Sequence, residues 1–180
     1  MKHLSARVVL AILTFAVATV VFGHGPTREK YSESIEIAAT PDAVWALVGD
    51  YAHPEKWMNA VESTVAPPSL DKGAVRELKI KGATATIKEE LKNLDAEKKT
   101  IQYKIVDPTE PSVAPVNNYS ARITVEAAGT GAKVEWDAAF YRWFLNNNPP
   151  DGENEAAAKA FVEKIVHDSL ASLKATAEKK

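Results

Sequence analysis

The chain has 180 residues, with 22 lysines and arginines, 24 aspartates and glutamates, and no cysteine. Its formal net charge of −2, without any basic run longer than two residues, argues against a nucleic-acid partner. The absence of cysteine excludes disulfides and thiolate metal sites, so the folded state must be stabilised by packing.

Residues 1–23 have the layout of a secretory signal peptide. Lys2 and Arg7 give a positive start, residues 8–22 form an apolar core, and Gly23 supplies a small residue before the cleavage site. An uncleaved membrane anchor is the alternative, but the apolar run is shorter than the ~20 residues that cross a bilayer. We therefore expect cleavage after Gly23, a periplasmic location and no stable membrane anchor after cleavage. Residues 24–180 are then one domain.

The mature chain begins with a strand and two short helical pieces. Alternation from residue 31 places Ile35 and Ile37 on one face of a strand. Thr40-Pro41-Asp42 is typical of a helix start, because threonine caps the helix and proline suits its first turn. Residues 51–58, which include Trp57, predict a second short helical or irregular piece.

The rest of the chain predicts a strand meander followed by one long helix. A strand over residues 60–65 starts the meander, and turn-forming residues recur at 81–84, 95–99, 107–115 and 128–131. Residues 154–178 carry an apolar stripe at helical spacing, which must pack against the sheet. The predicted fold class is α+β, a curved antiparallel sheet of about seven strands around a long C-terminal helix.

Two charged residues fall on the inward face of neighbouring predicted strands. A two-residue hairpin loop at Gly82-Ala83 would place Leu78 opposite Ile87 and Arg76 opposite Glu89. The charged pair can be a structural ion pair in the core. Alternatively, it can project into a ligand-sized cavity and orient a polar group there.

The inward face is also strongly aromatic. Pairing about residues 129–130 would place Ile123 opposite Trp136 and Tyr119 opposite Phe140. Such side chains usually form the core, but buried tyrosine hydroxyls need partners, which favours a wet cavity. The candidate cavity residues are Trp57, Arg76, Glu89, Tyr103, Tyr119, Trp136, Phe140, Phe161 and Ile165.

No catalytic constellation is visible in the sequence. The histidines of the mature chain, His24, His53 and His167, have no metal-site spacing. A glycine-rich phosphate loop, a Gly-x-Ser-x-Gly elbow and a cysteine nucleophile are all absent. We therefore predict no metal, no cofactor and no catalytic residue. An enzyme would have to use Glu89, Arg76 and the tyrosines.

Several segments resemble a known superfamily in type and order. They are residues 39–45, Gly49-Asp50-Tyr51, Trp57, residues 76–78 and residues 89–91. Together they look like the START-like SRPBCC superfamily, which includes Bet v 1-like and polyketide cyclase-like proteins. The resemblance spans about residues 31–177. It implies the helix-grip fold.

A closer resemblance is carried by residues 115–119, 139–142, 146–150 and 170–174. These segments are similar to MxaD-type accessory proteins of bacterial methanol oxidation. The resemblance implies a periplasmic helper that assists the interaction of methanol dehydrogenase with its cytochrome c, and it implies no catalysis by this chain.

Residues 108–118 and 142–154 are the loops expected to contact those partners, because their prolines, asparagines and aromatics suit recognition. Within them, Trp143-Phe144-Leu145 is expected to be exposed. Plain connection between elements is the other interpretation of these loops. The partner-contact candidates are Arg142, Trp143, Phe144, Asn147 and Pro149. The alternative function is a carrier or cyclase-like enzyme that holds a small apolar molecule between sheet and helix.

Overall fold

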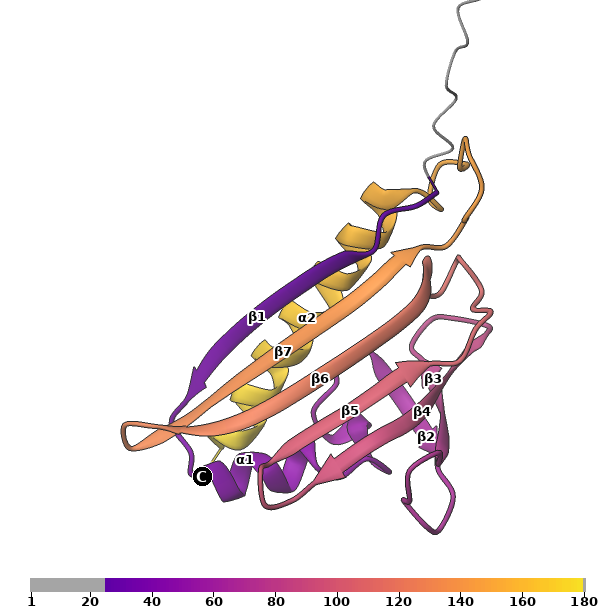
Figure 1. Cartoon of the computed structure of the whole chain (residues 1–180). Coiled ribbons are helices and arrows are strands. Elements are labelled where there is room, and N and C mark those ends of the chain that lie inside the picture. The colour runs from indigo at the N-terminus through magenta and orange to yellow at the C-terminus, as the bar shows by residue number, and fades with distance from the viewer. Residues whose placement is uncertain (1–24, 180) are drawn as a thin grey trace, which may run out of the picture.

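The computed structural model describes residues 25–179 and shows seven strands in one antiparallel sheet (Figure 1). The predicted signal peptide lies outside these residues. The strands are β1 (Glu29–Ile37), β2 (Val61–Val65), β3 (Val75–Ile80), β4 (Thr86–Asp95), β5 (Thr100–Ile105), β6 (Val116–Ala128) and β7 (Gly131–Arg142). Their order in the sheet is β1-β7-β6-β5-β4-β3-β2. The first strand in the sequence, β1, therefore forms one edge of the sheet and pairs with the last strand, β7.

Three helical segments accompany the sheet: α1 (Pro41–Val48), the 3₁₀ helix η1 (Pro54–Lys56) and α2 (Glu155–Ala177). The Thr40 hydroxyl accepts a hydrogen bond from the Ala43 amide, and Pro41 occupies the first turn, as predicted. Asn154 caps the long helix α2, because its side chain accepts a hydrogen bond from the Ala157 amide at 2.9 Å. In the described part of the chain, no helix has the length and apolar character needed to span a membrane.

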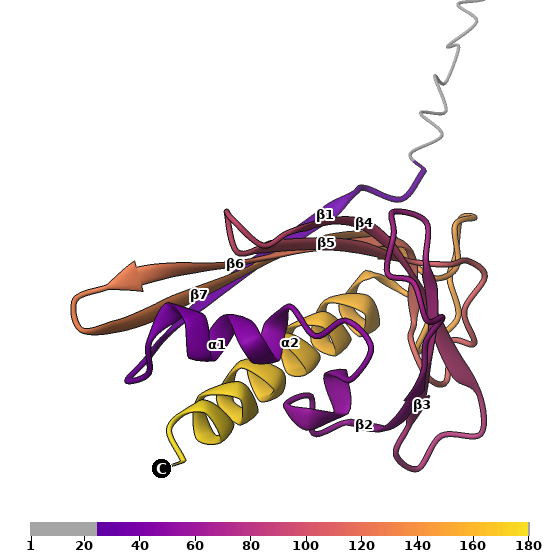
Figure 2. The same ribbon diagram turned by 90° about the horizontal axis from the view of Figure 1, so that it is seen from below.

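Helix α2 lies along one face of the sheet, with α1 beside it (Figure 2). Val162, Val166, Leu170 and Leu173 are buried against the strands, which confirms most of the predicted stripe. The opposite face of β1, β7, β6 and β5 is turned toward the viewer in Figure 1 and carries no helix. The predicted α+β class and the curved sheet around one long helix are thus confirmed.

The strand registers follow from the hairpins. Arg76 is opposite Glu89 and Leu78 opposite Ile87, as the Gly82-Ala83 hairpin predicts. Gly82 has φ of 76°, which glycine adopts without steric cost.

The β6–β7 pairing is regular near its hairpin and shifts farther along. Ile123 is opposite Trp136, again as predicted. The register shifts between Asn117 and Ser120, where Asn118 has φ of 47°. This irregularity places Val116 opposite Arg142.

Candidate functional site

The two inward charges form a buried ion pair. Arg76 and Glu89 are each 4% exposed. Arg76 Nε donates to Glu89 Oε2 at 2.7 Å, and an Arg76 terminal nitrogen lies 2.5 Å from the same oxygen. Neighbouring strands β3 and β4 therefore present one compact charge pair to the interior.

Tyr51, in the turn that follows α1, completes this cluster. Its carbonyl accepts a hydrogen bond from Arg76 at 2.7 Å, and its hydroxyl donates to the Glu89 carbonyl at 2.7 Å. The Arg76 guanidinium also lies 4.0 Å from the centre of the Tyr51 ring and 5.4 Å from that of Tyr103. Guanidinium groups stack favourably on aromatic faces. The pair is thus held on several sides and joins the segment after α1 to the sheet.

Sequence reasoning did not identify Tyr51 as a member of this cluster. It lies in an irregular segment, where neither a two-residue nor a 3.6-residue period indicates which way a side chain points. The one feature of the sequence that suggests a buried position for Tyr51 is its large aromatic side chain directly after Gly49-Asp50, where a helix ends.

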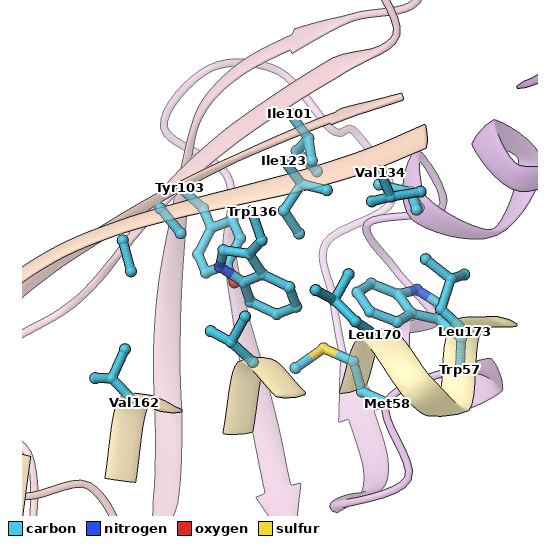
Figure 3. Packing of buried hydrophobic residues seen from close by; sticks show 14 of the residues in the cluster. Trp57, Met58, Ile101, Tyr103, Ile123, Val134, Trp136, Val162, Leu170 and Leu173 are labelled. Carbon is cyan, nitrogen blue, oxygen red and sulfur yellow. The ribbon is translucent and has the colours of Figure 1, made fainter. Parts of the chain in front are cut away.

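Aromatic side chains pack beside the ion pair, and Figure 3 shows three of them, Tyr103, Trp136 and Trp57, in the core between the sheet and α2. The ring centres of Tyr103 and Tyr119 are 6.4 Å apart, and those of Tyr119 and Phe140 are 6.5 Å apart. Trp57 meets Trp136 edge to face at 5.9 Å. These separations are typical of aromatic packing in a protein core.

The cavity that residues 25–179 leave between the sheet and α2 is small, with a volume of about 50 Å³. Among the predicted cavity residues, its lining includes Glu89, Tyr103, Tyr119, Trp136, Phe161 and Ile165. The other three, Trp57, Arg76 and Phe140, are buried in the surrounding core. Ligand sites usually occupy ~300–1,000 Å³, so this space suits a few water molecules at most.

The chemistry available at the cavity is limited. The Nε1 atoms of Trp57 and Trp136 and the Ser169 hydroxyl are buried without a hydrogen-bond partner among residues 25–179. The Glu89 carboxylate is engaged by Arg76 and borders this cavity of about 50 Å³. Within the same residues, no group of three histidines, aspartates or glutamates could hold a metal ion.

We predict that the protein carries no small molecule in this interior. Native mass spectrometry of protein purified from its own host should give the mass of the polypeptide alone, because the cavity is too small for a ligand. A stoichiometric adduct that disappears on unfolding would contradict this prediction.

The tyrosines make stability sensitive to alkaline pH. The hydrogen bond to Glu33, followed by burial and nearby carboxylates, raises the pKa of Tyr31 to about 12. Burial raises the pKa of Tyr51, Tyr103 and Tyr119. Since unfolded tyrosine titrates near ~10, the unfolded state releases protons first as pH rises.

The contribution of these tyrosines to the free energy of unfolding should therefore be fully present below that pH and fall as pH rises, with the Tyr31 contribution lost by about 12. Denaturant unfolding followed across this range measures the slope, and Tyr31→Phe should make it shallower. Complete ionisation of these tyrosines before the protein unfolds would show that the interpretation is wrong.

The predicted partner-contact residues lie at one end of the sheet, in two loops of residues 106–115 and 143–154, here called the end loops. Arg142 is buried. Its side chain donates to the carbonyls of Phe144 and Asn146, at 2.6 and 2.9 Å, and pairs with Glu155. Arg142 therefore holds the second end loop against the start of α2 and is not available as a surface contact.

The other candidates lie nearer the surface. Trp143 is half-buried and donates through Nε1 to the Thr109 carbonyl at 2.7 Å, which joins the two end loops. Phe144 and Pro149 are also half-buried, and Asn147 is exposed. Of the expected exposed stretch Trp143-Phe144-Leu145, only Leu145 is exposed, at 44%. Trp143 and Phe144 contribute more to loop structure than the sequence suggested.

Comparison with known proteins identifies the family and the fold. Residues 28–178 match the family model described as polyketide cyclase/dehydrase and lipid transport. No functionally curated protein matches the chain.

Solved structures match over most of the chain. The protein XoxI from Bacillus cereus is 26% identical, with 81% of this chain and 93% of that chain covered and a TM-score of 0.65. The Zhui aromatase/cyclase from Streptomyces sp. R1128 is 17% identical, with 84% and 94% covered and a TM-score of 0.68. Ara h 8.0201 is 16% identical, with 84% and 98% covered and a TM-score of 0.64. The latter two likenesses concern the fold alone.

Together with the helix-grip arrangement of one curved sheet around α2, the match over residues 28–178 shows that this chain belongs to the polyketide cyclase/dehydrase and lipid transport family, within the SRPBCC superfamily that its sequence resembles.

Proposed function

We propose that this protein is an exported, periplasmic accessory protein of methanol oxidation. In this proposal it assists the interaction of methanol dehydrogenase with the cytochrome c that takes its electrons. The proposal starts from the resemblance of residues 115–119, 139–142, 146–150 and 170–174 to MxaD-type proteins. The first three of these segments lie at one end of the sheet. The signal-peptide layout of residues 1–23 supports the location.

The observation that carries the proposal is where these three segments meet. The Thr109 hydroxyl, in the first end loop, lies 2.7 Å from the Ala114 carbonyl and 3.0 Å from the Val116 carbonyl. Trp143 then connects Thr109 to the second end loop. Arg142 fixes that loop to α2. Three of the four segments that carry the resemblance thus support one surface at the end of the sheet, which these contacts stabilise.

The composition of this surface suits protein recognition. Leu145 and the three asparagines that follow it are exposed. The end loops contain the carboxylates of Asp107, Glu110, Asp151 and Glu153 and no lysine or arginine. Loops that expose an apolar residue and also carry polar and acidic groups favour a partner surface with both apolar and basic groups.

The interior supports this function over the carrier or cyclase alternative. A cavity of about 50 Å³ cannot hold a drug-sized molecule, and its only carboxylate is paired with Arg76. An accessory protein that acts through its surface requires no interior ligand.

Electron transfer in a reconstituted system tests the proposal. Purified mature protein is added to methanol dehydrogenase and its cytochrome c, and cytochrome reduction is followed with methanol present. We expect a faster rate at limiting partner concentrations, because a helper raises the fraction of productive encounters. An unchanged rate, together with no detectable complex, would refute the proposal.

A further inference from the structure

The face of the sheet opposite α2 carries an open groove that the proposed function does not use. This groove has a volume of about 590 Å³ and is lined by residues of β1, β7, β6, β5 and β4. Figure 1 shows the order of these strands in the sheet. The outward-pointing residues Lys30, Lys92, Gln102, Arg122 and Asp137 contribute to its lining.

Two cross-strand rows explain why a groove forms on a sheet surface. In one row, Lys30 is opposite Ala139, which is opposite Ser120, which is opposite Lys104. The short side chains of Ala139 and Ser120 form a low floor between two lysines. In the next row, Arg122 lies between Asp137 and Gln102 and forms one side of the depression.

Positive charge is concentrated around this groove, although the chain as a whole is net negative. The outward cationic side chains in and beside it are Arg28, Lys30, Lys92, Lys104 and Arg122. The opposing carboxylates are Asp137 in the lining and Glu90 beside it. Glu90 pairs with both Lys92 and Lys104, at 2.5 and 3.1 Å. Neither Lys30 nor Arg122 has a salt-bridge partner among residues 25–179.

On the same outward face, the charge becomes predominantly negative toward the hairpin between β6 and β7. There, Lys133 is accompanied by Glu36, Glu126 and Glu135, and these carboxylates raise its pKa. An anionic partner is therefore directed to the half of the face that holds the groove.

We propose that this groove binds an acidic, extended polypeptide segment of a partner protein. Lys30 and Lys104 are separated by three strand intervals, about 14 Å at the usual spacing. A segment lying across the strands advances about 3.3 Å per residue, so carboxylates four positions apart reach both lysines from the same side of the segment. Arg122 offers a planar guanidinium to a carboxylate between them.

The inference goes beyond the proposed function and is tested without the redox partners, so that either can fail alone. Isotope-labelled protein is titrated with a deca-glutamate peptide, and amide chemical shifts are followed by NMR. We expect saturable shifts centred on Ser32, Ser120, Arg122 and Ala139, with an affinity that decreases as salt is added. A deca-glutamine peptide should leave the same amides unshifted.

Charge reversal provides matched variants. Lys30→Glu and Arg122→Glu should each weaken deca-glutamate binding at least about tenfold, or ~1.4 kcal/mol. Lys72→Glu, at an exposed lysine outside the groove, should change the affinity less than about twofold. The spectrum of each variant reports whether its fold is intact.

Three outcomes would overturn the inference. They are saturation without shifts in the groove, equal weakening by Lys72→Glu, or tighter binding of the same groove to DNA or to vesicles containing anionic lipid. The last result would assign the groove to a different class of partner.

Discussion

Replacing Arg76 by methionine should lower the free energy of unfolding by about 3–5 kcal/mol. The substitution removes two hydrogen bonds, to Glu89 and to the Tyr51 carbonyl, as well as the stacking on the Tyr51 ring. It leaves the Glu89 carboxylate, which is 4% exposed, without its cation. An unpaired buried charge is the largest source of this loss.

Equilibrium unfolding in urea measures the effect against two matched variants. Lys79 lies on the same strand as Arg76 and forms an exposed ion pair with Glu62 on β2. Lys79→Met removes this pair and should lower the free energy of unfolding by less than about 1 kcal/mol. The double variant Arg76→Met/Glu89→Leu should recover much of the loss, because both charges are gone. If Arg76→Met and Lys79→Met had equal effects, the ion pair would not have the structural role assigned to it.

Trp136→Ala should also destabilise the protein by about 3–5 kcal/mol. Trp136 is 1% exposed, packs edge to face on Trp57, and lines the cavity between the sheet and α2. Truncation enlarges this cavity, so the lost van der Waals contacts are not replaced by other side chains.

Two further substitutions indicate the source of this loss. Trp136→Phe should cost less than Trp136→Ala, since it keeps an aromatic ring and removes an Nε1 group that has no partner in the described chain. Trp143→Ala, at a half-buried tryptophan in an end loop, should also cost less. Thermal or urea unfolding of the three variants measures the loss in free energy of unfolding for each and so gives their order. A loss for Trp136→Ala no larger than that for Trp143→Ala would contradict the packing assigned here.

The fold and the charged pair could be predicted because they depend on periodic patterns. A strand has a two-residue period, so one turn at Gly82-Ala83 sets the partners of every residue in β3 and β4. The stripe along α2 identified the face that packs on the sheet in the same way. Arg76 and Glu89 could therefore be placed opposite each other without a structure.

The size of the cavity and the ion-pair partner of Arg142 could not be predicted in this way. Volume depends on how Tyr119, Trp136 and Phe161 interlock, and alternation along a strand contains no such information. Alternation from Trp136 and Phe140 continues to Arg142 and places it on the inward face. Its ion-pair partner Glu155, however, comes from the start of α2, which strand alternation does not indicate.

The most direct test of the proposed function compares electron transfer with two surface variants. Leu145→Asp changes the exposed apolar residue of the end loops, and Val75→Asp changes a residue on β3 with nearly the same exposure, 43% against 44%. If the end loops contact the redox partners, Leu145→Asp should raise the concentration needed for half-maximal stimulation at least about tenfold, because a charge then faces the apolar centre of the contact. Val75→Asp should stimulate cytochrome reduction as the wild type does. Equal stimulation by wild type and both variants would contradict a role for the end loops in partner contact.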